Sequence, residues 1–271
     1  MTLDERVMTA DRTLPARRRV RPFLLGELAV VALLLVVYDH VRALAHVHQA
    51  AAVHHGSSIL DLEHALHLNL EPAVNHWLSS QAVLGRLSVD YYQYLHVGVA
   101  MGLLVACYVY RPHVYRPARN ALLFVNAVGL AVYVAYPVAP PRLLPGSTFL
   151  DMVSRAGFGS SHGGPIPIDQ YGAMPSLHLA WAVWAALIGF ALTEVVWVRC
   201  LLLLHPIVTT FVVVGTANHY LLDAVMGGAL ACAAVACVFV PRTFTNQQRG
   251  PLRWFPTVSF RRRGSRELPS P

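Results

Sequence analysis

Three residues in the second half of the chain have the types and spacing needed for acid–base or nucleophilic chemistry. His178 follows Pro175-Ser176-Leu177, and His219 precedes Asp223 by four residues. On a helix, residues spaced i,i+4 lie on one face roughly 6 Å apart, so the carboxylate can hold one imidazole nitrogen. A histidine oriented in this way is a nucleophile or a base, and a second histidine can supply or accept a proton.

Two arginines and the small residues of Gly172-Ala-Met-Pro-Ser176 extend this set toward phosphate chemistry. Arg142 ends the stretch Tyr136-Pro-Val-Ala-Pro-Pro-Arg142, and Arg155 lies further along the non-apolar loop 138–174. Arginine offsets the charge of a transferring phosphoryl group, and backbone N–H groups at a helix start such as Ser176 can approach an anion. Phosphoryl transfer through a phosphohistidine is the chemistry that suits these residues best. We therefore expect His178, His219 and Asp223 to be catalytic, and Arg142, Ser176 and Arg155 to bind the substrate phosphate.

The composition places these residues in a membrane protein. The chain has 271 residues, of which 55% are hydrophobic and only 13% are charged, which predicts an all-α, polytopic integral membrane fold. The net charge of +7 is the excess of 21 basic residues, all of them arginine, over 14 acidic ones. The arginines concentrate beside apolar runs, a pattern typical of membrane topology and not of nucleic-acid binding. The four cysteines lie in or beside apolar segments, without the spacing of a disulfide or zinc framework.

Hydropathy predicts about six transmembrane helices. Their expected ranges are 23–38, 90–110, 121–136, 176–192, 201–216 and 219–240. We interpret the first as an uncleaved helix, and the other interpretation is a signal peptide. The segment 138–174 is the longest non-apolar loop, and long loops in compact domains are usually functional.

The histidine-rich segment 46–87 is amphipathic, and its apolar runs are too short to span a bilayer. It predicts one or two helices lying in the outer membrane interface. His64 and His67 share a helical face there, but convincingly placed carboxylate or cysteine partners are missing, so we predict no metal site. We predict no cofactor.

Arginine positions predict the orientation of the chain in the membrane. All arginines except Arg42, Arg86, Arg142 and Arg155 fall in segments expected to be cytoplasmic. Both termini are then cytoplasmic and the histidines extracytoplasmic, in what we expect to be a bacterial plasma membrane. The predicted organisation is a basic N-terminal segment (1–22), a membrane-embedded lipid phosphatase or phosphotransferase domain (23–240) and a disordered basic tail (241–271).

These motifs resemble those of a known family. Pro175-Ser176-Leu177-His178 with His219-x-x-x-Asp223 resembles the type 2 phosphatidic acid phosphatase superfamily. Gly172-Ala-Met-Pro-Ser-Leu-His178 with Asn218-His-Tyr-x-x-Asp223 resembles its inositol phosphorylceramide synthase-like branch, over about residues 57–240. The resemblance implies a six-helix membrane fold, no required metal, His219 as nucleophile, Asp223 as its orienting residue and His178 as general acid. The implied partners are a phosphorylated lipid substrate and the bilayer.

The chain departs from the superfamily pattern at two basic positions. The first motif of the superfamily has a lysine and Arg-Pro, whereas this chain has no lysine and Arg142 is followed by Leu143. The third has Ser-Arg where this chain has Val212-Val213, a loss that the synthase-like branch tolerates.

Two alternatives remain open on sequence alone. One is an anion or lipid transporter, and the other is a haem protein with His178 and His219 as axial ligands.

Overall fold

The computed structural model describes residues 22–45, 48–158 and 171–246, and these residues form a helical membrane protein. Four helical stretches among them are long and apolar enough to cross a bilayer, and two shorter apolar helices accompany them. The four are 82–110, which comprises α4 (Ala82–Asp90), a π turn (Tyr91–Leu95) and α5 (His96–Tyr110), then α6 (Pro112–Ala135), α9 (Val196–Gly215) and the part of α10 from Leu221 to Phe239. The shorter two are Leu24–Leu34 within α1 (Leu24–Ala45) and α8 (Leu177–Leu192). The all-α polytopic fold is confirmed, and the count of six spans stays a prediction.

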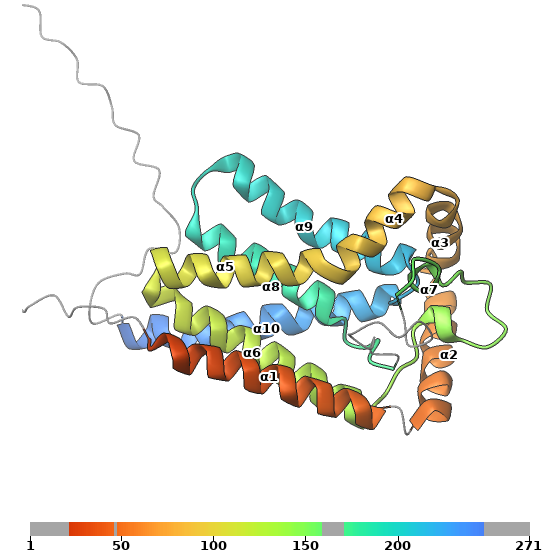
Figure 1. Ribbon diagram of the computed structural model, residues 1–271, viewed down its shortest axis with the longest axis horizontal. Coiled ribbons are helices and arrows are strands. Elements are labelled where there is room, and N and C mark those ends of the chain that lie inside the picture. The colour runs from red at the N-terminus through yellow and green to blue at the C-terminus, as the bar shows by residue number, and fades with distance from the viewer. Residues whose placement is uncertain (1–21, 46–47, 159–170, 247–271) are drawn as a thin grey trace, which may run out of the picture.

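The long helices run side by side, with α8 at the centre of the bundle (Figure 1). Helix α8 contacts α5, α6, α9 and α10, and Trp184 within it is fully buried. Its indole Nε1–H donates to the Ala118 carbonyl of α6 at 3.0 Å, so the polar edge of the ring is satisfied inside the bundle. Large apolar side chains on the outer helices, such as Leu201 and Leu203, stay exposed, as lipid-facing residues do.

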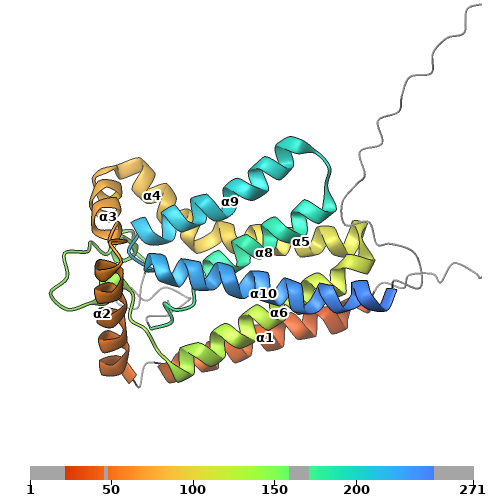
Figure 2. The same ribbon diagram turned by 180° about the vertical axis from the view of Figure 1, so that it is seen from behind.

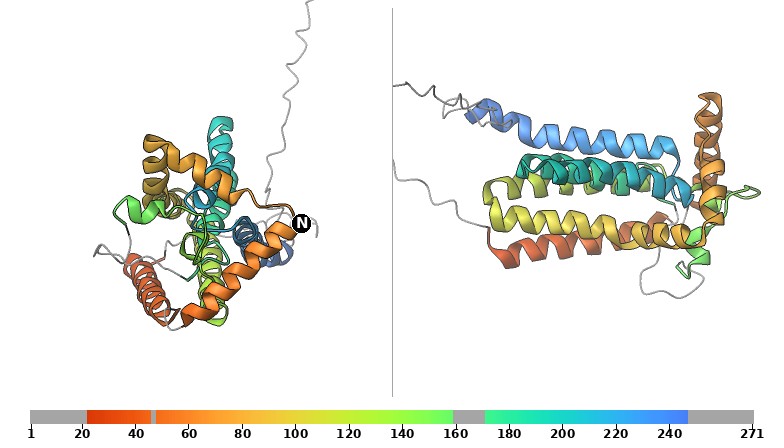
Figure 3. Two further views of the ribbon diagram at one scale, coloured as in Figure 1. Left: turned by 90° about the vertical axis from the view of Figure 1, so that its right-hand side faces the viewer. Right: turned by 90° about the horizontal axis from the view of Figure 1, so that it is seen from above.

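Two short helices lie across one end of this bundle. They are α2 (Gln49–Ala65) and α3 (Glu71–Ser80), and they run nearly perpendicular to the long helices in the views from the front, from behind and from above (Figures 1, 2 and 3). This is the placement predicted for interfacial helices in the segment 46–87. Asn75 joins α3 to the end of α9, because its Nδ2 donates to the Gly215 carbonyl at 2.9 Å.

Several element boundaries differ from the predicted ones. Helix α6 begins at Pro112 and not near 121, with proline in its first turn, and Arg119 inside the helix forms an ion pair with the mostly buried Glu27 of α1. Most of helix α4 falls in the predicted interfacial segment 46–87, yet this helix continues through the π turn into α5. The predicted loop 138–174 contains a 3₁₀ turn (Pro141–Leu143) and the short helix α7 (Met152–Arg155).

The predicted terminal segments lie largely outside the described residues. The basic segment 1–22 falls there except for its last residue, as do residues 247–271 of the predicted tail. The first part of that tail differs from the prediction, because α10 continues to Asn246. The described helices α1 and α10 begin and end, respectively, at the end of the bundle opposite α2 and α3 (Figure 1).

Candidate functional site

The two predicted catalytic histidines meet at the end of the bundle that α2 and α3 cover. His219 Nε2 lies 3.3 Å from His178 Nδ1, and the two rings pack edge to face with centroids 5.4 Å apart. His178 lies in the first turn of α8 and His219 just before α10, and both helices begin at this end (Figure 2). The sequence prediction that these side chains face one boundary of the membrane therefore agrees with the geometry.

His219 itself lies just before α10 and not within it, which corrects the predicted start of the last span. Ala217 has a φ of 56°, which turns the chain sharply after α9. The Val213 carbonyl then accepts hydrogen bonds from the backbone N–H groups of Asn218 and His219, at 3.0 and 3.1 Å. Val213 stands where the resembling family has arginine, so at this position the side chain supplies no cation, and only the backbone carbonyl takes part in the turn.

A backbone carbonyl, and not Asp223, is the nearest partner of the His219 ring. Nδ1 lies 2.7 Å from the Ala173 carbonyl and 3.5 Å from Asp223 Oδ2. Because a carbonyl only accepts, Nδ1 carries the hydrogen and Nε2 keeps its lone pair toward His178. The Ala173 carbonyl is held by a parallel bridge between Val138 and Gly172, so the two ends of the long loop orient the histidine.

Asp223 is fully buried and caps the turn that carries His219. Its Oδ2 accepts from the Tyr220 N–H at 3.0 Å, while Oδ1 has no hydrogen-bond partner among the described residues. The backbone carbonyl of Asp223 accepts from the Ser176 N–H at 3.0 Å. Ser176 is fully buried and caps α8, because its Oγ accepts from the Leu179 N–H at 3.3 Å. The starts of α8 and α10 are thus locked together.

Two aromatic residues that the sequence reasoning did not assign to the site pack on His178. The Tyr92 ring stacks on it with centroids 4.3 Å apart, and the His96 ring lies at 4.2 Å with a tilt of 50°. Tyr92 belongs to the π turn Tyr91–Leu95, and His96 follows it directly. Such π turns inside helices are frequent at functional sites. His96 Nδ1 and Trp181 Nε1 are buried without hydrogen-bond partners among the described residues. Hydropathy carries no signal for a π turn, so the periodicity of the sequence could not reveal that Tyr92 and His96 pack against His178.

Arg142 is tied to the turn that holds His219. Its backbone N–H donates to the Ala217 carbonyl at 3.1 Å, and its side-chain Nε donates to Asn218 Oδ1 at 2.9 Å. Nη1 forms an ion pair with Asp151 Oδ2 at 3.1 Å, and Asp151 also caps α7. A guanidinium has five N–H donors, so these two side-chain contacts leave others available for an anion.

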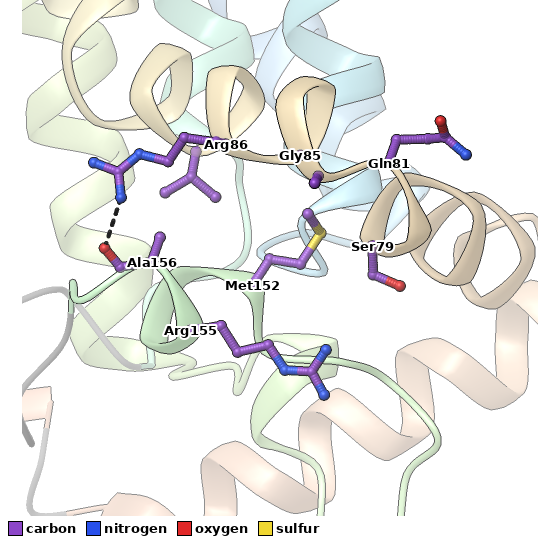
Figure 4. A pocket seen from close by; sticks show the side chains of 9 residues that line it. Ser79, Gln81, Gly85, Arg86, Met152, Arg155 and Ala156 are labelled. Atoms are coloured by element: carbon purple, nitrogen blue, oxygen red, sulfur yellow. Dashed lines mark hydrogen bonds between the residues drawn. The ribbon is translucent and has the colours of Figure 1, made fainter.

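Arg155 lies apart from this arrangement. It lines a pocket of about 220 Å³ with residues of α3, α4 and α7, and the labelled side chains of Arg86 and Arg155 point in different directions (Figure 4). The Arg86 guanidinium is bonded to the Ala156 carbonyl and Asp90. Neither histidine lines this pocket, so the structure does not bring Arg155 together with the paired histidines.

Two buried glutamates beside the site were not predicted from the sequence. Glu71 of α3 accepts from the Leu221 N–H at 3.1 Å, and Glu63 of α2 accepts from the Leu222 N–H at 2.7 Å. The pKa of Glu63 is raised to about 8, chiefly by burial and also by the neighbouring Glu71 and Asp223 carboxyls, while the hydrogen bond from the Leu222 N–H acts in the lowering direction. Contacts that join residues so far apart in the chain leave no local pattern in the sequence.

The segment 46–76 is not organised as a metal centre in the described residues. No group of three or more histidine, cysteine, aspartate or glutamate side chains there or elsewhere in the described chain has the geometry to hold a metal ion. His55 instead stacks on Tyr136 at 3.8 Å and bonds the Pro137 carbonyl through Nδ1 at 2.8 Å. This histidine helps to anchor α2 against the loop that leads to Arg142.

A helical integral membrane protein with paired histidines at one end of its bundle is the class that the fold and site define. The sequence matches the PAP2 superfamily over residues 57–237, which contain both histidines, Asp223 and Arg142. The chain therefore belongs to the PAP2 superfamily.

Comparison with individual proteins adds little to the family assignment. The crystal structure of Aquifex aeolicus LpxE is similar, with 17% sequence identity and a TM-score of 0.49, over 64% of this chain and 94% of that chain. No curated protein matches the sequence.

Proposed function

We propose that this protein is a membrane-embedded lipid phosphatase or phosphotransferase that works through a phosphohistidine at His219. The observation that carries the proposal is the pair of facing nitrogens, His219 Nε2 and His178 Nδ1, 3.3 Å apart. The hydrogen bond from Nδ1 to Ala173 leaves the Nε2 lone pair available for attack. Membership of the PAP2 superfamily supports the same reaction class.

The proposed reaction has two halves. In the first, His219 Nε2 forms a bond to phosphorus, the bond from phosphorus to the leaving oxygen breaks, and His178 gives that oxygen a proton. In the second, water or an alcohol attacks phosphorus while His178 takes its proton, and the bond to Nε2 breaks. Phosphorus must occupy the place that His178 Nδ1 now holds at Nε2. We therefore expect substrate binding to move the two rings apart.

Arg142 is the proposed principal phosphate ligand. Its Nε–H donates to Asn218, the residue before His219, so the guanidinium lies beside the nucleophile. Its charge offsets that of the phosphoryl oxygens. Ser176 at the start of α8 stays a predicted phosphate ligand, but its own N–H donates to the Asp223 carbonyl and must leave that acceptor to bind an anion. Arg155 stays a predicted phosphate ligand, and its pocket position suits a contact with a more distant part of a substrate headgroup.

The proposed site faces the extracytoplasmic side, with both termini in the cytoplasm. Arg111, Arg116 and Arg199 lie at or near the starts of α6 and α9, at the end of the bundle opposite α2 and α3 (Figure 1). The proposed substrate is a phosphorylated lipid whose tail stays in the bilayer, since the helices around the site are apolar on their outer faces. Within the superfamily, the quoted motifs favour the inositol phosphorylceramide synthase-like branch.

Phosphate release by the purified protein tests this proposal. Wild type, His219→Ala and the control His64→Ala, which changes an exposed histidine of α2, are assayed in detergent with EDTA on a panel of lipid and polyprenyl phosphates. Release by wild type and the control, but not by His219→Ala, is expected for a phosphatase. Transfer only after an alcohol acceptor is added identifies a phosphotransferase. The proposal is contradicted if wild type neither releases phosphate from any member of the panel nor transfers it to an alcohol.

A further inference from the structure

Three consecutive backbone N–H groups at the start of α10 are each bound by a carboxyl group. Tyr220 N–H donates to Asp223, Leu221 N–H to Glu71 and Leu222 N–H to Glu63, at 3.0, 3.1 and 2.7 Å. The three carboxyls come from three helices, because Glu63 belongs to α2, Glu71 to α3 and Asp223 to α10. These N–H groups lack partners inside their own helix, so carboxyl oxygens there satisfy buried donors and favour the helix dipole.

The burial of this cluster sets its charge. Glu63 and Glu71 are both fully buried, and their second oxygens have no hydrogen-bond donor among the described residues. The two carboxyl groups bind the N–H groups of consecutive residues, Leu221 and Leu222, so they lie beside each other, and the Glu71 carboxyl raises the pKa of Glu63. Two ionised carboxylates in that position repel each other without solvent, whereas a single proton between them satisfies both free oxygens. The pair then carries one negative charge, in place of two.

A simple cap does not account for this arrangement. Serine, threonine, asparagine and aspartate cap a helix start locally, as Ser176 does for α8. Here two long acidic side chains are buried instead, which is costly unless their contacts serve the site. They reach from α2 and α3 to the residues that directly follow His219, and Glu63 and Glu71 both interact electrostatically with Asp223.

We propose that Glu63 and Glu71 form a pair that shares one proton and positions the catalytic turn. By holding Leu221 and Leu222, the pair fixes the start of α10 and with it His219 and Asp223. The interfacial helices α2 and α3 are then part of the active-site framework. Glu63 and Glu71 are positioning residues, since neither contacts the reacting nitrogens. The inference rests on the proposed role of His219, but the shared proton is testable without it.

Substitutions separate the shared proton from a purely steric cap. Glutamine keeps an oxygen for the backbone N–H and an NH₂ donor for the remaining carboxylate, so it reproduces the protonated partner. Glu63→Gln and Glu71→Gln are each expected to keep turnover within about threefold of wild type, while Glu63→Ala, which leaves a buried N–H unpaired, is expected to lose about tenfold or more. Asp61→Asn, an exposed change on the same helix, is the control.

Thermal unfolding of the full-length protein in detergent, measured from pH 5 to 9, is the decisive readout. The wild-type Tm is expected to fall as pH rises toward 8, because the pair loses its proton, and Glu63→Gln is expected to remove most of that fall. Glu71 and Asp223 face Glu63, and Tyr220 lies within electrostatic range of all three. These groups stay unchanged in Glu63→Gln.

The same pH dependence of the Tm in wild type and Glu63→Gln overturns the shared proton. Loss of phosphate release by both Gln variants, with the Tm unchanged, overturns the positioning role. A flattened Tm profile without phosphate release by wild type counts against the proposed function alone.

Discussion

The close contact between α10 and the start of α8 allows a sharp mutational prediction at Gly227. A Cβ atom added there would lie 3.0 Å from the Ser176 carbonyl carbon and 3.3 Å from its nitrogen, and closer still to its oxygen. Non-bonded carbon atoms pack at about 3.5–4.0 Å, so Gly227→Ala must push the start of α8 away by on the order of 1 Å. All three of these atoms belong to backbone, so no side-chain rotation relieves the clash.

The displacement acts directly on the site, because Ser176 is two residues before His178 and donates its N–H to Asp223. A misplacement of about 1 Å can reduce turnover about 100-fold. Overpacking of this kind typically costs about 1–3 kcal/mol of stability. We therefore expect Gly227→Ala to lose turnover by one to two orders of magnitude and to lower the Tm by several degrees.

The neighbouring glycine provides a matched control. A Cβ at Gly228 meets Val183 at 3.7 Å and Leu179 at 3.9 Å, which is ordinary contact. Alanine is the better helix former by about 1 kcal/mol, so Gly228→Ala is expected to keep turnover and to keep or raise the Tm. The assay compares phosphate release and unfolding of wild type and both variants. Wild-type turnover and Tm in Gly227→Ala would refute the contact between α8 and α10 that the structure describes.

Three further predictions concern the proton donor, the phosphate ligands and the buried acid. His178→Ala is expected to lose much more activity on alkyl phosphates than on nitrophenyl phosphate esters, because a good leaving group needs no proton; equal losses on both would argue against a general acid. Arg142→Gln is expected to reduce kcat/KM about 100-fold and Arg155→Gln far less, and the reverse order would move the phosphate site toward the Arg155 pocket. The raised pKa of Glu63, from 4.5 to about 8, means that the folded protein holds a proton that the unfolded chain releases, so its contribution to stability is full below about pH 4.5 and is lost as pH rises to about 8. Chemical denaturation at pH 5.5 and 8.5 checks this, and greater stability at pH 8.5 would contradict it.

The sequence predicts the parts of this protein that follow from hydropathy and short motifs. Apolar runs place the long helices, and their number between His178 and His219 returns the chain to the same end of the bundle. The two histidines therefore had to lie near one another before any contact was known. Proline at the first turn of α6 is likewise a local signal, although it lies between the predicted spans 90–110 and 121–136.

The sequence does not predict features that depend on contacts between distant segments. The Ala173 carbonyl displaces Asp223 as the nearest partner of His219 because the bridge between Val138 and Gly172 brings it there. His219 leaves the helix because Ala217 takes a positive φ, a conformation that alanine rarely adopts and that no local pattern signals. Glu63 had no feature to distinguish it from the exposed Asp61 before the fold placed it under α10.

Covalent labelling of the enzyme tests the central claim most directly. Wild type, His219→Ala and His64→Ala are mixed with a lipid phosphate carrying radioactive phosphorus, quenched within milliseconds to seconds in alkali, and digested to locate the label. The account predicts a label on His219 that is stable in alkali and lost in acid, as a phosphorus–nitrogen bond is, in wild type and the His64 variant only. Full turnover by His219→Ala, or a label that persists in that variant, would contradict it.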